Sequence, residues 1–268
     1  MQEPRLSLDG LCKQFPAPSG PVTVLEPTSF CLHPTELVSI VGPSGCGKST
    51  LLHIVGGLIQ PSGGRVLLDG REVFEADADR GMVFQGYTLF PWLTVRGNVE
   101  FGPRQRGIKK AERRQIADHF LEAVGLTGFA NHYPKQLSGG MRQRVAIARA
   151  LANAPRVLLM DEPFGALDAQ TRLVMQEMLI DLRRRENTTI LFITHDIDEA
   201  VFLSDRVFVM TARPGRFKAE IDVPFGADRA SDICRTPEFF AIRSRVYDLL
   251  HDEGRAVAER ELAAASGH

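Results

Sequence analysis

Residues 42–50 of this chain read GPSGCGKST, and this stretch decides the fold class. It follows the apolar run 37–41 and precedes the helix-like run 51–56. A strand, a glycine-rich turn and a helix, in this order, form the context in which the pattern G-x-x-x-x-G-K-S/T binds phosphate. The glycines let several backbone N–H groups converge, and the positive end of the following helix adds to the attraction for an anion. A turn that merely joins a strand to a helix is the alternative, and the complete pattern disfavours it.

Two side chains of the loop have predicted roles of their own. Lys48 places a positive charge near the β- and γ-phosphates of a nucleotide, and the Ser49 hydroxyl is suited to Mg²⁺. The residues predicted to bind nucleotide here are Gly42, Pro43, Ser44, Gly45, Cys46, Gly47, Lys48, Ser49 and Thr50.

Composition sets limits on the class of protein. The chain has 268 residues, of which 44% are hydrophobic and 24% charged, as in a globular domain with a proper core. Its net charge of −1 gives no electrostatic case for nucleic acid. The four cysteines form no C-x-x-C pair and read as reduced thiols. No signal peptide is visible and no apolar run reaches the ~20 residues of a membrane span, so any membrane partner is a separate chain.

Three predicted strands, each an apolar run, end directly in polar side chains. These side chains are Gln85, Asp161, with Glu162 after it, and His195, and the phosphate loop follows a fourth such strand at Gly42. Ligands of open α/β sheets bind beyond the carboxyl ends of the strands, so we expect Gly42, Gln85, Asp161 and His195 around one phosphate tail. The alternatives are a buried core histidine at 195, a plain loop amide at 85 and acids that only cap a strand.

The order of predicted elements divides the chain into three parts. Residues 1–85 and 156–225 alternate strands with helices, which predicts a nucleotide-binding α/β core with a mixed sheet. Residues 86–155 read as a mostly helical subdomain inserted into that core. Residues 226–268 are predicted to form a C-terminal helical extension.

Finer expectations concern the two ends of the chain. Residues 5–41 read as short strands broken by turns. We expect a helix from about Pro237 to Leu250, whose apolar stripe covers the chain's own core or docks a partner. Residues 254–268 are expected to be a frayed tail.

Taken together, these features resemble the ATP-binding subunit of an ABC transporter. The resemblance rests on the loop at 42–50, the signature Leu137–Met141, the strand into Asp161-Glu162, the pair Leu167-Asp168 and His195, all in order. It implies a P-loop NTPase (RecA-like) core with an inserted helical subdomain, in an ABC transporter domain over residues 5–235. It also implies ATP and Mg²⁺ as cofactors.

The resemblance also implies roles for single residues. Glu162 is the general base for the attacking water, and His195 contacts the γ-phosphate. Asp161 and Ser49 hold Mg²⁺, with Gln85 sensing the metal and the water. Phe15 stacks on the base, although a loop aromatic tucked onto the core is an equal alternative for this residue.

The signature also favours an anion, through Ser138 and the N–H groups of Gly139 and Gly140. The loop with Lys48 already provides one phosphate site, so the signature needs a different role. The resemblance implies that two copies meet head to tail as a homodimer, so that each signature completes the other copy's site. Ser138, Gly139 and Gly140 then bind the partner's nucleotide, and Asp168 lies at the seam.

Three stretches are similar to the nitrate, sulfonate and taurine importer group: 79–85, 89–95 and the turn Arg213–Arg216. This resemblance implies uptake of a small anion through a separate permease, at the cytoplasmic face of the cell membrane. A periplasmic or lipid-anchored solute-binding protein takes part indirectly. Residues 89–93 either form the floor of a groove for a permease helix or are buried. The alternatives are an exporter or lipoprotein-release ATPase and, less favoured, a soluble ABC ATPase.

Overall fold

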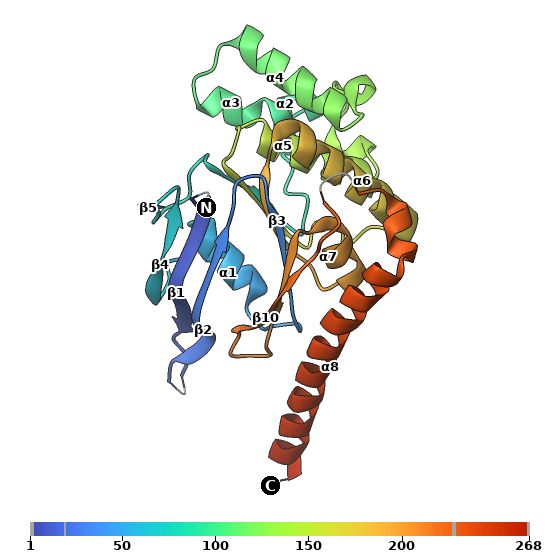
Figure 1. Cartoon of the computed structure of the whole chain (residues 1–268). Helices are drawn as coiled ribbons and strands as arrows, with labels where there is room; N and C mark the ends of the chain where they lie inside the picture. The colour runs from blue at the N-terminus through green and yellow to red at the C-terminus, as the bar shows by residue number, and fades with distance from the viewer. Residues whose placement is uncertain (1–2, 19, 227–228, 267–268) are drawn as a thin grey trace.

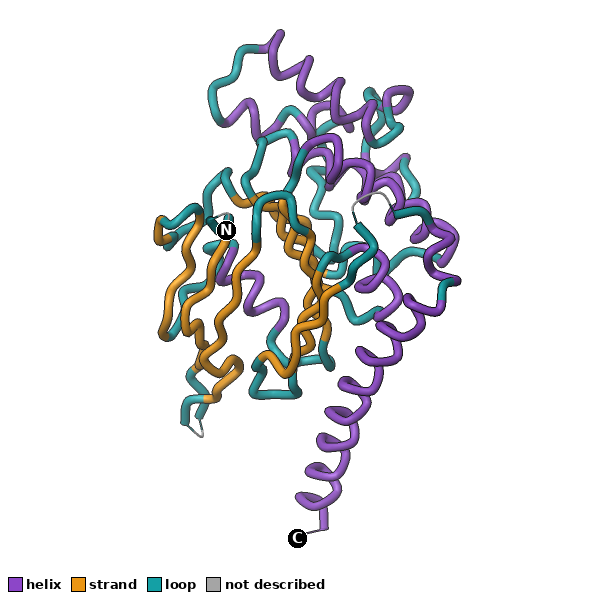
Figure 2. Tube along the Cα trace, in the orientation of Figure 1, coloured by secondary structure: helices purple, strands orange, loops and turns teal. Residues whose placement is uncertain are grey.

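The computed structural model describes residues 3–18, 20–226 and 229–266 and builds them into two sheets with helices (Figures 1 and 2). The strands are β1 (Leu6–Phe15), β2 (Val22–Leu32), β3 (Leu37–Val41), β4 (Gly63–Leu68), β5 (Arg71–Glu72), β6 (Arg80–Val83), β7 (Val157–Asp161), β8 (Thr189–Ile193), β9 (Arg206–Met210) and β10 (Phe217–Asp222). The helices are α1 (Lys48–Val55), α2 (Val95–Val99), α3 (Phe101–Gln105), α4 (Lys110–Ala123), α5 (Gly139–Leu151), α6 (Ala169–Glu186), α7 (Ile197–Leu203) and α8 (Pro237–Ser266).

The larger sheet carries the polar strand ends. Its order is β10-β9-β3-β8-β7-β6, and all neighbouring pairs are parallel except β10 with β9. The central strands β3, β7 and β8 are buried along their whole length, which explains their uninterrupted apolar sequences. The sheet is mixed, as predicted.

The smaller sheet has the order β2-β1-β4-β5 and is antiparallel. The expectation of short strands over 5–41 holds for β3, with five residues, but was wrong for β1 and β2, which run for 10 and 11 residues. The β1–β2 register shifts between Leu8 and Leu11, around Gly10 with φ 59°. A bulge at a left-handed glycine lets a strand continue where its pattern breaks, so one long strand reads as two short ones.

Helix α1 lies between the two sheets, as Figure 1 shows. Its Leu51 and Leu52 are fully buried in one cluster with Leu6 and Leu11 of β1 and with Ile40 of β3. This packing fixes the start of α1, and with it the phosphate loop, against both sheets.

The other face of the large sheet is covered by α5, α6 and α7. The stretch 86–155 holds α2 to α5 with two short 3-10 helices. Ser138 caps α5 as predicted, because its Oγ accepts a hydrogen bond of 3.3 Å from Met141 N.

No helix in the described part of the chain is long and apolar enough to cross a membrane.

Helix α8 corrects the expectation for the last residues. It does not fray after Leu250 but continues to Ser266 and projects from the body of the molecule (Figure 1). Its first half docks through Phe239 and Val246, which are 2% and 0% exposed. The second half is rich in alanine, glutamate and arginine, which have high intrinsic helix propensity.

Candidate active site

The phosphate loop joins β3 to α1 and curls tightly. Gly47 precedes the helix with φ 106°, and a Cβ there would lie 2.8 Å from Leu25 Cδ2, so only glycine fits. The Lys48 ammonium donates hydrogen bonds to Gly42 O at 2.7 Å and Pro43 O at 3.0 Å. These bonds fold the lysine back over the loop, where it faces the space in which an anion would sit.

The Sγ of Cys46 lies 4.0 Å from Lys48 Nζ. It is fully buried in the core beneath the loop, and burial raises the pKa of its thiol. Only the backbone of Cys46 is therefore in a position to serve the nucleotide role predicted for this residue.

Asp161 ends β7 opposite the start of α1. Its Oδ1 accepts a hydrogen bond of 3.0 Å from Ser49 Oγ, and the side chain of His53 lies 3.9 Å from Oδ2. Burial raises the pKa of Asp161, although the Ser49 hydrogen bond and the charge of His53 oppose this shift. A buried carboxylate is costly unless it is paired, so a cation at this position would stabilise the ionised form of Asp161.

The pair Ser49 and Asp161 fits Mg²⁺. Hydroxyl and carboxylate oxygens suit this ion, which usually takes one or two protein ligands and completes its shell with phosphate and water oxygens. The described residues hold no cluster of three or more His, Cys, Asp and Glu side chains that could cage a metal. Ser49 and Asp161 would leave the remaining positions around such an ion to phosphate and water oxygens.

Glu162 lies at the centre of a small polar group. Its Oε2 is 3.0 Å from His195 Nδ1 and 3.5 Å from Gln85 Nε2. The three side chains come from the ends of β7, β8 and β6, as the strand-end argument predicts. Glu162 also has φ 44°, which is unusual for a residue with a side chain and typical of functional positions.

A cavity of about 510 Å³ opens in front of the loop. Its lining residues are Phe15, Val24, Ser44, Gly45, Gly47, Lys48, Ser49, Thr50, Gln85, Glu162 and Arg213. Phe15 is 36% exposed, so its ring is available to a ligand. Lys13 Nζ lies 4.9 Å from the centre of that ring.

The structure does not bring the signature residues to this cavity. Ser138, Gly139, Gly140 and Asp168 are absent from its lining. They gather elsewhere, because a Cβ on Gly140 would lie 2.6 Å from Thr171 Cγ2 and Thr171 is bonded to Asp168 at 2.9 Å and 2.7 Å. The hydrogen bonds from Thr171 lower the pKa of Asp168, which keeps this exposed carboxylate ionised.

Two residues near the site carried no chemical prediction. His53 lies one turn along α1 from Ser49, a spacing that could have indicated contact with Asp161. Arg213 lines the cavity from the loop after β9, and nothing local in the sequence shows that this loop reaches the nucleotide side.

The family model described as ABC transporter matches residues 25–165. The chain belongs to the ABC transporter family. The nitrate import ATP-binding protein of Synechocystis sp. is 47% identical over 97% of this chain and 99% of its own length. The taurine import ATP-binding protein of Roseobacter denitrificans is 45% identical over 92% of this chain and 94% of its own.

A solved dimeric ATP-binding cassette in a post-hydrolysis state, bound to ADP and Pi, has the same fold. It matches with a TM-score of 0.72 and 35% identity, over 82% of this chain and 100% of that one. This chain is accordingly an ABC-type ATPase with a P-loop NTPase fold, and the predicted fold class and enzyme class are confirmed.

Proposed function

We propose that this chain is the ATP-hydrolysing subunit of an importer for a small anion such as sulfonate, taurine or nitrate. The observation that carries the hydrolytic part is the convergence of His195 and Gln85 on Glu162 Oε2 beside the phosphate loop. The importer part is supported by the similarity to nitrate and taurine import proteins.

Phosphoryl transfer to water depends mainly on positioning and on stabilising charge. In the proposed site Lys48 and the loop N–H groups hold the β- and γ-phosphates. Glu162 takes the proton of the attacking water, and His195 holds the glutamate and contacts the γ-phosphate. Ser49 and Asp161, with Gln85, would hold Mg²⁺, which neutralises phosphate charge when it is bound.

A second copy of this chain completes each site in our proposal. Helix α5 begins after Ser138 with the N–H groups of Gly139 and Gly140, which attract an anion. None of these residues lines the nucleotide cavity of its own copy. A head-to-tail homodimer places this helix start against the partner's triphosphate and Asp168 at the seam. ATP then favours the closed pair, and hydrolysis lets it reopen.

The proposed permease contact is a groove of about 340 Å³, lined by Phe84 and Thr88 on either side of Gln85 in the sequence. Phe90 and Phe101 line it with rings 4.3 Å apart, and the Arg149 guanidinium lies 5.4 Å from the Phe90 ring. Trp92 is 70% exposed next to Phe90. An aromatic groove with an exposed indole suits an amphipathic helix of a membrane partner.

This contact would hold the protein at the cytoplasmic face of the membrane. A solute-binding protein outside would act only through the permease. Trp92→Ala is expected to reduce co-purification with the permease from detergent, whereas Phe74→Ala should not, because it removes a ring that is 61% exposed and does not line the groove. Uptake of labelled taurine, sulfonate or nitrate by cells would separate import from export and lipoprotein release.

Mixed dimers test the composite site. Lys48→Ala and Ser138→Arg should each abolish hydrolysis in a homodimer. In a mixed pair, the Lys48 of one copy faces the intact signature of the other, which restores one site. Recovery of ATPase activity on mixing supports the head-to-tail arrangement, and a mixture as inactive as its components contradicts it.

A further inference from the structure

The loop after β9 brings one arginine to the nucleotide cavity. Arg213 is exposed and lines the cavity with Phe15 and Val24. Among the residues that the structure describes, nothing forms a hydrogen bond or ion pair with its guanidinium. We propose that Arg213 binds the nucleoside end of the nucleotide, meaning its base, ribose and α-phosphate, and that α8 holds it in place. This inference rests on the nucleotide site proposed above.

The Arg213 loop is wedged between β2 and the phosphate loop. Gly215 N donates a hydrogen bond of 2.8 Å to Val24 O, and Glu26 N donates one of 2.9 Å to Gly215 O. On the other side, a Cβ on Gly215 would lie 2.0 Å from Cys46 O, so the two loops touch along their backbones. Any movement of the phosphate loop therefore also displaces the loop that carries Arg213.

The strand order decides which end of the nucleotide Arg213 meets. Gln85, Glu162 and His195 follow β6, β7 and β8, which all lie on one side of β3. Strand β9 lies on the other side of β3, and Arg213 follows it. Because the phosphate loop follows β3 itself, the γ-phosphate points toward the first group and the nucleoside end toward Arg213.

Phe15 gives a second reason for this placement. It pairs with Val22 at the start of β2, the strand to which the Arg213 loop is bonded two residues later. The aromatic ring and the guanidinium thus reach the same end of the cavity from one anchor strand. A planar guanidinium both stacks on aromatic bases and donates paired hydrogen bonds to phosphate oxygens, and this end of a nucleotide offers both partners.

Helix α8 braces the loop from behind. Glu253 Oε2 accepts a hydrogen bond of 3.0 Å from Ala212 N, next to Arg213. Lys218 Nζ lies 2.9 Å from Glu253 Oε1 and donates to Leu249 O at 3.0 Å. Burial alone would raise the pKa of Glu253, but these contacts outweigh it and lower the pKa, so the carboxylate stays charged. Glu253 acts as a positioning residue for Arg213.

Calorimetric titration with ADP and with a non-hydrolysable ATP analogue tests Arg213. Arg213→Ala should weaken binding of both ligands about tenfold, because both carry the nucleoside end. Arg216→Ala is the matched control, since that arginine lies on the same loop with an exposed side chain and a loose 3.9 Å contact to Glu26. Unchanged affinity for both ligands overturns the inference, as does a loss confined to the ATP analogue, which would indicate a γ-phosphate contact.

A double-mutant cycle tests the brace. Glu253→Ala should weaken ADP binding about threefold in the natural chain and have no further effect in an Arg213→Ala background. A purely structural role for Glu253 would give equal losses in both backgrounds and contradict the positioning role. Lys48→Ala separates the two proposals. If this variant binds ADP as well as the natural chain does, the proposed nucleotide site itself is wrong. If only Arg213→Ala leaves ADP affinity unchanged, this inference alone is overturned.

Discussion

His195 Nδ1 lies 3.0 Å from Oε2 of Glu162, a residue held in the left-handed region with φ 44°. Glu162 N donates a hydrogen bond of 2.9 Å to Ile193 O, so the backbone is held in this conformation by the neighbouring strand. Such a conformation costs about 1–3 kcal/mol in a residue with a side chain. The sheet tolerates this cost, and the carboxylate is thereby aimed at the cavity and at His195.

Glu162→Gln should bind ATP, form the dimer and hydrolyse poorly. The amide keeps the shape of the side chain but cannot take a proton from water, so turnover is expected to fall by about 10²- to 10⁴-fold. Phosphate release and size-exclusion chromatography with ATP measure the two effects. An active variant that stays monomeric with ATP would contradict both the base and the dimer.

The backbone strain at position 162 can be measured by comparing Glu162→Gly with Glu162→Ala. Both remove the carboxylate, but only glycine occupies the left-handed region without steric conflict. We expect Glu162→Gly to have a free energy of unfolding about 1 kcal/mol higher than Glu162→Ala, from urea melts at one pH. A Glu162→Gly variant less stable than Glu162→Ala would contradict the strain, because glycine then shows only its entropic cost of about 0.5–1 kcal/mol.

Buried Glu199 should make stability fall as pH rises. Burial raises its pKa above the ordinary 4.5, although hydrogen bonds from Thr194 and Gln176 oppose this. The folded protein therefore keeps this proton to higher pH than the unfolded chain, and stability is lost between 4.5 and the raised value. Glu199→Gln cannot ionise and should lose less stability over this pH window in urea melts. The remaining slope comes from Asp161 and Asp79, whose pKa values burial also raises. An unchanged slope would refute the assignment.

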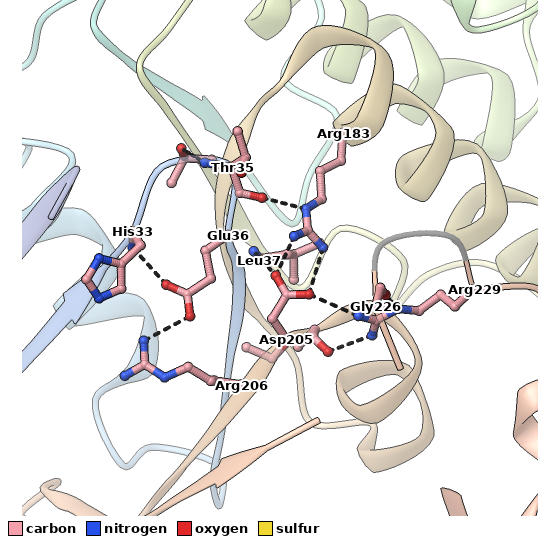
Figure 3. Close-up of polar contacts among 12 residues, drawn as sticks. His33, Thr35, Glu36, Leu37, Arg183, Asp205, Arg206, Gly226 and Arg229 are labelled. Carbon is pink, nitrogen blue, oxygen red and sulfur yellow. Dashed lines mark hydrogen bonds and ion pairs between the residues drawn. The ribbon is translucent and has the colours of Figure 1, made fainter. Parts of the chain in front are cut away.

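Asp205 joins the buried Arg229 and the partly buried Arg183 near the start of β9 and β3 (Figure 3). It pairs with Arg183 and, at 3.0 Å, with Arg229, and its Oδ2 also accepts a hydrogen bond of 2.9 Å from Leu37 N at the start of β3. The side chain of Arg229 is only 1% exposed. Removing the anion would leave its charge buried and unpaired.

Asp205→Ala should therefore lower the free energy of unfolding by about 3 kcal/mol. Asp9→Ala is the control, because its ion pair with Arg65 has both side chains more than half exposed, at 59% and 52%. That change should cost less than about 1 kcal/mol. Equal losses in chemical denaturation would mean that the buried cluster contributes nothing special.

The parts of the site that could be predicted are those where the chemistry follows a strand directly. Gln85, Asp161, Glu162 and His195 each follow an apolar run, and parallel strands bring their ends together whatever the rest of the chain does. Arg213 also follows a strand, but its approach to the cavity depends on contacts of its loop with Val24 and Cys46, more than 160 residues earlier. Such long-range contacts leave no periodic pattern in the sequence.

Gly215→Ala should weaken nucleotide binding and reduce stability. The added Cβ would lie 2.0 Å from Cys46 O and 2.7 Å from Met210 Cε, so the backbone of the phosphate loop would have to shift. Overpacking of this kind costs about 1–3 kcal/mol. Gly128→Ala is the control, because nothing lies within 4 Å of its Cβ position. ADP titration and thermal melts measure the two effects, and a stability loss with unchanged ADP affinity would show that the contact supports the core and not the phosphate loop.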